Sequence, residues 1–279
     1  MADYKIEELG GKTPLEAAQT PNLDNIAFHG LVGVVNTVPE VSPPGSDIAC
    51  LSVMGYDPEE YYTGRAPIEA ASLGINLDKH AWAVRCNLIT RNDTILEDFC
   101  AGHISSKEAS LIISTLNEKL GTDTIHFYAG KSYRNIMTYR GNIRLEAECT
   151  PPHDIIGKSI RSNLPRGEGG DVLIDLMMNS YEILLNHDVN KERISLGKNP
   201  ANMIWLWGQG QQPTLPLFKD LYNLSGAVIT GVDLLKGLGV YLDLDVIDVP
   251  GATGYFDTDY EAKATYAIEA FNTHDLVLI

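Results

Sequence analysis

One serine of this chain stands where a phosphate could be carried. Ser46 follows a turn made rigid by Pro43, Pro44 and Gly45, and it stands at what reads as the start of a helix, before Asp47. The free N–H groups at a helix start stabilise an anion, so a phosphate on Ser46 would be held there. As a nucleophile, the hydroxyl would need a base or a metal ion to activate it. The other interpretation is an N-cap, in which the hydroxyl accepts a backbone N–H bond.

Helices and short strands alternate on both sides of this serine. Thr20 and Gly30 bound a predicted helix, and the β-branched run 31–38 after it predicts a strand. Ser105 and Glu108 form a capping box at the start of another helix. Further apolar runs that predict strands are 202–208, 226–232, 245–249 and 276–279, the last of them read as buried. Strands that alternate with helices indicate an α/β layered fold with a mainly parallel sheet.

The middle of the chain has longer strands and proline-rich loops. We therefore expect an α/β domain that is split in sequence by a smaller, inserted α+β domain. The predicted division is 1–78 for the first part, 79–199 for the inserted domain and 200–279 for the second part. The two linkers, near 75–79 and 197–201, would act as hinges.

Composition restricts the partners of this chain. There are 37 acidic and 21 basic residues, for a net charge of −16, and such a field repels nucleic acids and anionic membranes. A small anion needs a local pocket with its own cations. No apolar run is long enough to span a bilayer, and no signal peptide is visible. The four cysteines form no CxxC pair, which favours unpaired thiols and a cytoplasmic location.

Seven motifs follow one another in order over essentially the whole chain. They are PPGSD, GYDPEEYYTGRAPIEAASLG, AGHIS, TPPHDI, NPANMIWLWGQG, VDLLKGLG and VPGATGYFDTDYEAKA. Together they resemble the archaeal-type, cofactor-independent phosphoglycerate mutases of the alkaline phosphatase superfamily. The resemblance implies an alkaline-phosphatase-like three-layer sandwich with an inserted substrate-binding domain.

The resemblance also implies a reaction. Ser46, the serine of PPGSD, would take the phosphate from 3-phosphoglycerate and return it to the other hydroxyl of the reoriented glycerate, as a step of glycolysis. Two divalent ions would activate the serine oxygen and neutralise the charge of the transferring group. The ion is commonly Mn2+, with Mg2+ or Zn2+ as alternatives. The expected partner is a small phosphorylated substrate, and the oligomeric state stays open.

This sequence departs from the family pattern at the metal ligands. Family members begin with a strand that ends in Asp-Gly, directly before the Met-Ala-Asp that opens this chain, and that aspartate is a metal ligand. Their other ligands lie in His and Asp motifs beyond the strand matched by LVLI. Only Ser46 of the family's ligands is present, and one oxygen does not hold a divalent ion. We therefore expect an incomplete form without a competent two-metal site. Cys50 is a smaller departure, since the family usually has asparagine there.

Seven further residues are candidates for binding the carboxylate and phosphate of the substrate. They are Arg65, His103, Arg134, His153, Asp154, Gln209 and Lys236. All of them except Gln209 also have a structural interpretation. Arg65 could pair with Asp57 or Glu69, His103 could be a packed loop histidine, and Arg134 could be a solvated strand residue. His153 and Asp154 could simply bond to each other, and Lys236 could be a surface lysine at a turn.

Two other functions fit the same motifs. A bacterial branch of similar sequence has been proposed to phosphorylate homoserine, but that activity predicts nucleotide dependence, and neither a GxxxxGK[ST] motif nor a kinase-type glycine loop is present. The other alternative is a metal-free, non-catalytic protein that retains affinity for phosphate.

Overall fold

An antiparallel sheet of five strands forms the largest framework in the computed structural model, which describes residues 4–42 and 44–279. Its strands are β1 (Trp82–Asn92), β2 (Ile95–Asp98), β3 (Ile125–Lys131), β4 (Arg134–Tyr139) and β5 (Met203–Gln211). Strand β1 is central, because it pairs with β2, β4 and β5, and β3 pairs with β4. The largest sheet is thus antiparallel, and most of its strands come from the middle of the chain. The predicted run 202–208 also falls in this sheet, as part of β5, so the expectation of a parallel strand is wrong for that run.

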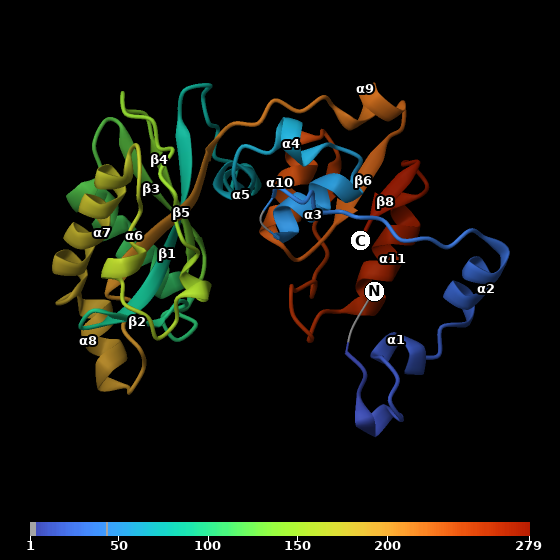
Figure 1. Cartoon of the computed structure of the whole chain (residues 1–279), viewed down its shortest axis with the longest axis horizontal. Helices are drawn as coiled ribbons and strands as arrows, with labels where there is room; N and C mark the ends of the chain where they lie inside the picture. Colours follow the sequence, from blue (N-terminus) through green and yellow to red (C-terminus); the bar gives the residue numbers. More distant parts are fainter. Residues whose placement is uncertain (1–3, 43) are drawn as a thin grey trace. The chain divides into compact units, whose positions relative to one another are not determined.

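Helices cover both faces of this sheet. Figure 1 shows α6 (Ser106–Leu120) and α7 (Gly170–Leu184) on one side and α5 (Arg65–Ser72) on the other. The capping box between Ser105 and Glu108 at the start of α6 is confirmed. Trp205 and Trp207 of β5 are buried. Helix α8 (Asp188–Ser195) and the short helices η2 (Pro152–Asp154) and η3 (Arg161–Asn163) complete this part.

A second, smaller sheet is parallel. It has the order β7-β6-β8, with β6 (Gly226–Ile229) between β7 (Asp245–Ile247) and β8 (Leu276–Leu278). The helices near it are α3 (Ser46–Val53), α4 (Pro58–Tyr61), α9 (Phe218–Tyr222), α10 (Asp233–Tyr241) and α11 (Tyr260–Ala270). The run 276–279 is a strand as predicted, but β8 is an edge strand with exposed to half-buried side chains, so the expectation of a buried strand is wrong.

The chain divides into two compact units, of which the first ends at Thr37 and the second begins at Val38. The first unit contains η1 (Glu7–Leu9), α1 (Pro14–Ala17) and α2 (Pro21–His29). Helix α2 has the predicted ends, with Thr20 as N-cap and Gly30 as C-cap. The predicted strand 31–38 is absent from the structure: its described residues adopt neither helix nor strand. Its apolar side chains are exposed, so they lack the half-buried setting that β-branched residues need in a sheet.

Overall, the structure is a mixed α/β fold. The three-part domain division at 79 and 200 stays a prediction. Among the described residues, no helix is both long and apolar enough to cross a bilayer. The four cysteines are unpaired, as expected.

Helix α10 packs against α5 through a glycine. A methyl group at Gly237 would collide with the carbonyl oxygen of Ile68. We expect Gly237→Ala to lower the free energy of unfolding by about 1–3 kcal/mol, because overpacking outweighs the gain in helix propensity of about 1 kcal/mol. Urea denaturation measures the change.

The same substitution at Gly33 is the control, since a methyl group there has no neighbour within 4 Å. Equal stability of the Gly237→Ala variant and the wild type would show that the two helices do not pack backbone to backbone.

Candidate active site

A cavity of about 530 Å³ opens between turns of the antiparallel sheet and loops of the parallel sheet. One wall comes from the turn after β2, the β3–β4 turn and the first turns of α5. The other wall comes from the loop between β6 and α10 and from the loop 253–257, which precedes α11. Its lining includes Arg65, Glu69, His103, Lys131, Tyr133, Arg134, Asp233, Thr253, Tyr255 and Asp257.

Cations dominate the first wall. Lys131 and Arg134 flank a tight turn in which Ser132 has a left-handed backbone, with φ of 59°. The guanidinium of Arg134 lies 5.2 Å from the ring centre of Tyr133, and that ring meets His103 edge-on at 6.5 Å. Among the described residues, no carboxylate lies within 4.0 Å of Lys131 or Arg134. Both charges therefore face the cavity without a neutralising ion pair.

Arg65 is held by a shared carboxylate. Its Nε lies 2.8 Å from Oε1 of Glu69, while Nε of Arg85 lies 3.0 Å from Oε2 of the same residue. The Arg85 contact is a charge contact, since its geometry makes no aligned hydrogen bond. The predicted alternative of an Arg65–Glu69 ion pair is thus present, and Arg65 lines the cavity as well.

The guanidinium groups influence one another electrostatically. Burial, together with the neighbouring charges of Arg65 and Arg134, lowers the pKa of Arg85 to about 10, although Glu69 opposes this. For Arg65, burial would lower the pKa, but Glu69 and then Asp47 outweigh burial and raise it. Three guanidinium groups therefore lie close enough to influence one another, and the buried carboxylates of Glu69 and Asp47 oppose part of their charge.

Ser46 is the first residue of α3 and is exposed. The N-cap is Gly45, so the interpretation of Ser46 as N-cap is wrong. Ser46 is not among the residues that line the cavity. Its neighbour Asp47 is buried and accepts a short hydrogen bond from the Tyr62 hydroxyl, which commits that carboxylate to a partner other than Ser46. Pro43, part of the expected rigid turn, lies outside the described residues.

The second wall is built from two loops in close contact. A Cβ on Gly231 would lie 2.5 Å from the carbonyl carbon of Thr253, so only glycine allows this approach. The Thr253 hydroxyl donates to Asp257 at 2.7 Å and accepts from the backbone N–H of Tyr255 at 3.3 Å. These bonds shape the loop that presents Asp257 and Tyr255 to the cavity.

Four of the seven predicted substrate-binding residues lie outside the cavity lining. The ring of His153 packs edge-on against Trp207 at 5.6 Å, and its Nε2 lies 3.8 Å from Asp154. Gln209 donates a short bond to the carbonyl of Ala147, and its Oε1 is buried without a partner among the described residues. Lys236 forms an ion pair with Asp248.

Sequence reasoning missed several lining residues. They are Lys131, Tyr133, Asp233, Thr253, Tyr255 and Asp257. Lys131 could have been found, because a tight turn at Ser132 places it beside Arg134. The acidic loop residues carried no comparable signal, since contacts between segments distant in sequence, such as that of Gly231 with Thr253, bring the two loops together.

Metal binding is the other chemistry that the described residues could supply. Within residues 4–42 and 44–279, no group of three or more His, Cys, Asp or Glu side chains could hold a metal ion. Ser46 supplies a single oxygen, and Asp47 is engaged by Tyr62. These residues do not fit the two-ion site that the resemblance implies.

Comparisons with known proteins agree on one family. The family model for 2,3-bisphosphoglycerate-independent phosphoglycerate mutase matches residues 27–190. Enzymes of that name from Methanosarcina barkeri and Methanosarcina acetivorans are 54% and 53% identical over 279 residues. The match covers 100% of this chain and 70% of each relative.

Solved structures give the same result. A protein from Pyrococcus horikoshii superposes with a TM-score of 0.76 at 29% identity, covering 100% of this chain and 67% of that one. The cofactor-independent phosphoglycerate mutase from Thermoplasma acidophilum superposes with a TM-score of 0.58, also at 29% identity, covering 99% of this chain and 73% of that one.

Removing the charge of Glu69 tests the bridge beneath the cavity. We expect Glu69→Gln to lower the free energy of unfolding by about 3–5 kcal/mol, because Arg85 is then left buried without its counter-charge. Arg85 is only 4% exposed. Chemical denaturation measures the loss, and Glu118→Gln is the control, since the Glu118–Lys119 pair is exposed. A loss no larger than that of the control would contradict the bridge.

His153 reports on the guanidinium groups. Burial, and to a lesser extent Arg85 and Arg65, lower the pKa of His153 below its ordinary value of 6.5, although Asp154 opposes them. Because the folded pKa lies below the unfolded one, the unfolded state binds more protons as the pH falls through this range, and folding loses stability there. A proton NMR titration of the ring should give a low midpoint that rises in Arg65→Gln.

His274 is the internal control for this titration, because its hydrogen bond to Asp245 raises its pKa instead. A His153 midpoint that stays unchanged in Arg65→Gln would show that the Arg65 guanidinium does not act on His153.

Proposed function

Because the chain belongs to the family of 2,3-bisphosphoglycerate-independent phosphoglycerate mutases, we propose that it binds phosphoglycerate in the cavity described above and that Ser46 is the phosphoryl acceptor. The reaction of the family is the isomerisation of 3- and 2-phosphoglycerate. We also propose a cytoplasmic location, which the four unpaired cysteines support.

The observation that carries this proposal is the cationic wall. The chain has a net charge of −16, yet Arg65, Lys131 and Arg134 lie on one wall of the cavity. Cations gathered against the overall charge of a protein focus an attractive field on an anion. Phosphoglycerate has two anionic groups, a carboxylate and a phosphate, and therefore suits a wall with several separate cations.

The residues of the wall have different parts in recognition. Arg134 has five N–H donors in a plane and can hold a carboxylate or phosphate bidentately. Lys131 adds a point charge from the other end of the same turn. Arg65 is already oriented by Glu69, so it offers its remaining donors without a large loss of side-chain freedom. His103 offers a ring nitrogen as a hydrogen-bond partner.

Ser46 would carry the phosphoryl group between two substrate hydroxyls. In the first transfer a bond forms between its Oγ and phosphorus while the ester bond to glycerate breaks, and the proton of the serine hydroxyl passes overall to the departing oxygen. The second transfer reverses these changes at the other hydroxyl. The exposed position at the start of α3 supports this role, because backbone N–H groups there stabilise the phosphate.

Metal ions remain the family's implied activators, but the described residues do not hold a pair of them. No step here is therefore assigned to a metal. Four further residues lie outside the cavity lining, namely His153, Asp154, Gln209 and Lys236. Their proposed role as substrate ligands rests on the family resemblance alone.

Calorimetric titration with 3-phosphoglycerate tests recognition. We expect Arg134→Gln to weaken binding by at least about tenfold, because a hydrogen-bonded charge is lost. Arg161→Gln is the matched control, since Arg161 is exposed on η3 and outside the cavity. Equal affinities of the two variants would contradict the cavity as the binding site.

Phosphorus NMR with added Mn2+ tests the transfer. Any 2-phosphoglycerate or phosphoenzyme that the wild type forms should be lost in Ser46→Ala, which should still bind 3-phosphoglycerate. Ser52→Ala, in the same helix, is the control and should behave as the wild type does. Product only from homoserine and ATP would overturn the mutase assignment, and turnover or phosphoenzyme retained in Ser46→Ala would overturn the role of Ser46.

A further inference from the structure

We propose that Arg193, a buried residue outside the cavity, is a positioning residue that holds His103 in place for substrate recognition. The inference deepens the proposed function and rests on it, because it takes the cavity as the place where phosphoglycerate binds. Arg193 lies on α8, and no atom of it lines the cavity.

The turn that presents His103 has an unusual backbone. Ala101, Gly102 and His103 have φ angles of 48°, 60° and 49°, so three successive residues are left-handed. Only glycine adopts this conformation without strain, and it occurs mostly as single residues. A turn with two non-glycine residues in this region persists only where the surroundings hold it.

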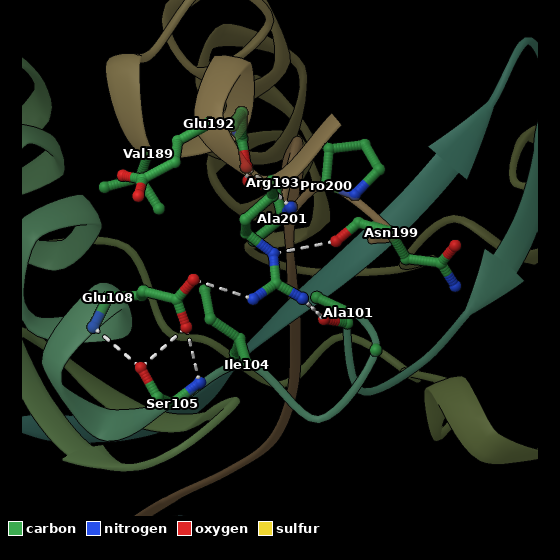
Figure 2. Close-up of polar contacts among 12 residues, drawn as sticks. Ala101, Ile104, Ser105, Glu108, Val189, Glu192, Arg193, Asn199, Pro200 and Ala201 are labelled. Atoms are coloured by element: carbon green, nitrogen blue, oxygen red, sulfur yellow. Dashed lines mark hydrogen bonds and ion pairs between the residues drawn. The ribbon is translucent and has the colours of Figure 1, made fainter. Parts of the chain in front are cut away.

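Arg193 supplies one of these constraints. Figure 2 shows its guanidinium between α8, the turn and the segment 199–201 that leads into β5. Its Nη2 donates to the carbonyl of Ala101 at 2.6 Å, its Nε to the carbonyl of Asn199 at 2.8 Å, and its Nη1 to Glu108 at 3.0 Å. Arg193 is only 2% exposed, so these bonds do not compete with water. The guanidinium thus fixes the first residue of the strained turn.

Asp98 supplies the second constraint. Its Oδ1 accepts from the backbone N–H of Cys100 at 2.8 Å, and its Oδ2 accepts from that of Gly102 at 2.5 Å. The side-chain amide of Asn199 donates to the same Oδ2 at 2.9 Å. Asn199 therefore links the two anchors, since its carbonyl accepts from Arg193. Arg193 thus bonds to the carbonyl of Ala101, and Asp98 accepts from the N–H groups of Cys100 and Gly102.

The residues directly after this turn are bonded to the β3–β4 turn that carries Lys131 and Arg134. The Ser132 hydroxyl donates to the carbonyl of Ile104 at 2.5 Å, and the backbone N–H of Ser132 donates to Ser106 at 3.0 Å. The wall of Lys131 and Arg134 is therefore anchored to Ile104 and Ser106, which follow the strained turn. Arg193 bonds to Ala101 on the other side of His103, so its effect on the cavity runs through the position of His103.

The role depends on the shape of the guanidinium. Three bonds leave Arg193 in three directions, and a methyl group at Gly102 would lie 3.2 Å from its Nη2. Lysine keeps the charge but cannot make this planar set of bonds. Arg193→Lys therefore separates orientation of the turn from simple loss of charge.

The experiment compares Arg193→Lys with the wild type by two measurements. The first is the aromatic carbon–proton NMR signal of the His103 ring without ligand, assigned by its loss in His103→Gln. The second is the Kd for 3-phosphoglycerate. We expect the ring signal to shift and the Kd to rise about tenfold, as for one lost hydrogen bond to a charged group. In a His103→Gln background, Arg193→Lys should add no further loss.

Lys191→Gln on the same helix is the control, because Lys191 pairs only with exposed Asp188 in the described contacts. An unchanged His103 signal in Arg193→Lys, or a Kd effect additive with His103→Gln, would overturn the inference. A wild type that fails to bind 3-phosphoglycerate would overturn the proposed function, and the ring signal would still decide whether Arg193 holds His103. If Arg193→Lys does not fold, Asp98→Asn tests the same turn by both measurements.

Discussion

The arrangement of this site depends on one buried carboxylate. Glu69 lies between Arg65 and Arg85, and Arg85 stacks over Trp207 with 4.5 Å between its guanidinium carbon and the ring centre. A guanidinium this deeply buried is tolerated only with a counter-charge, because burial removes its hydration. Glu69 therefore allows positive charge to gather inside an acidic protein. Through Arg65 it also places one of those charges at the cavity.

This constraint explains why the cavity needs both sheets. The antiparallel sheet carries the cationic turns, and α5 lies against it with Glu69. Helix α10, which packs on α5 through Gly237, starts at the acidic loop of the opposite wall. The same helix α5 thus touches the framework of both walls. A displacement of α5 would change the charge balance and the width of the cavity together.

Local signals were readable in the sequence, and contacts between distant segments were not. The Ser105–Glu108 capping box and the ends of α2 follow from residue types within one turn of a helix, and both were predicted. Arg65, His103 and Arg134 were candidates because charged residues stood in distinctive motifs. The carboxylates of the second wall and the role of Arg193 depend on contacts across the fold, which no local pattern reveals. The run 31–38 failed as a strand because β-branched residues need a half-buried surface, and here they are exposed.

Recognition and activation place different demands on these residues. The cations of the wall can neutralise both anionic groups of phosphoglycerate, but none of them removes a proton from Ser46. Asp47, the nearest carboxylate in sequence, is committed to Tyr62, whose hydroxyl is held protonated because burial and Asp47 raise its pKa. Activation of the serine oxygen therefore requires a group other than Asp47. Binding by the wall has no such requirement, since its charges are already in place. Under the proposed function the two steps are thus separable, and affinity for phosphoglycerate would report on the wall and not on activation of the serine.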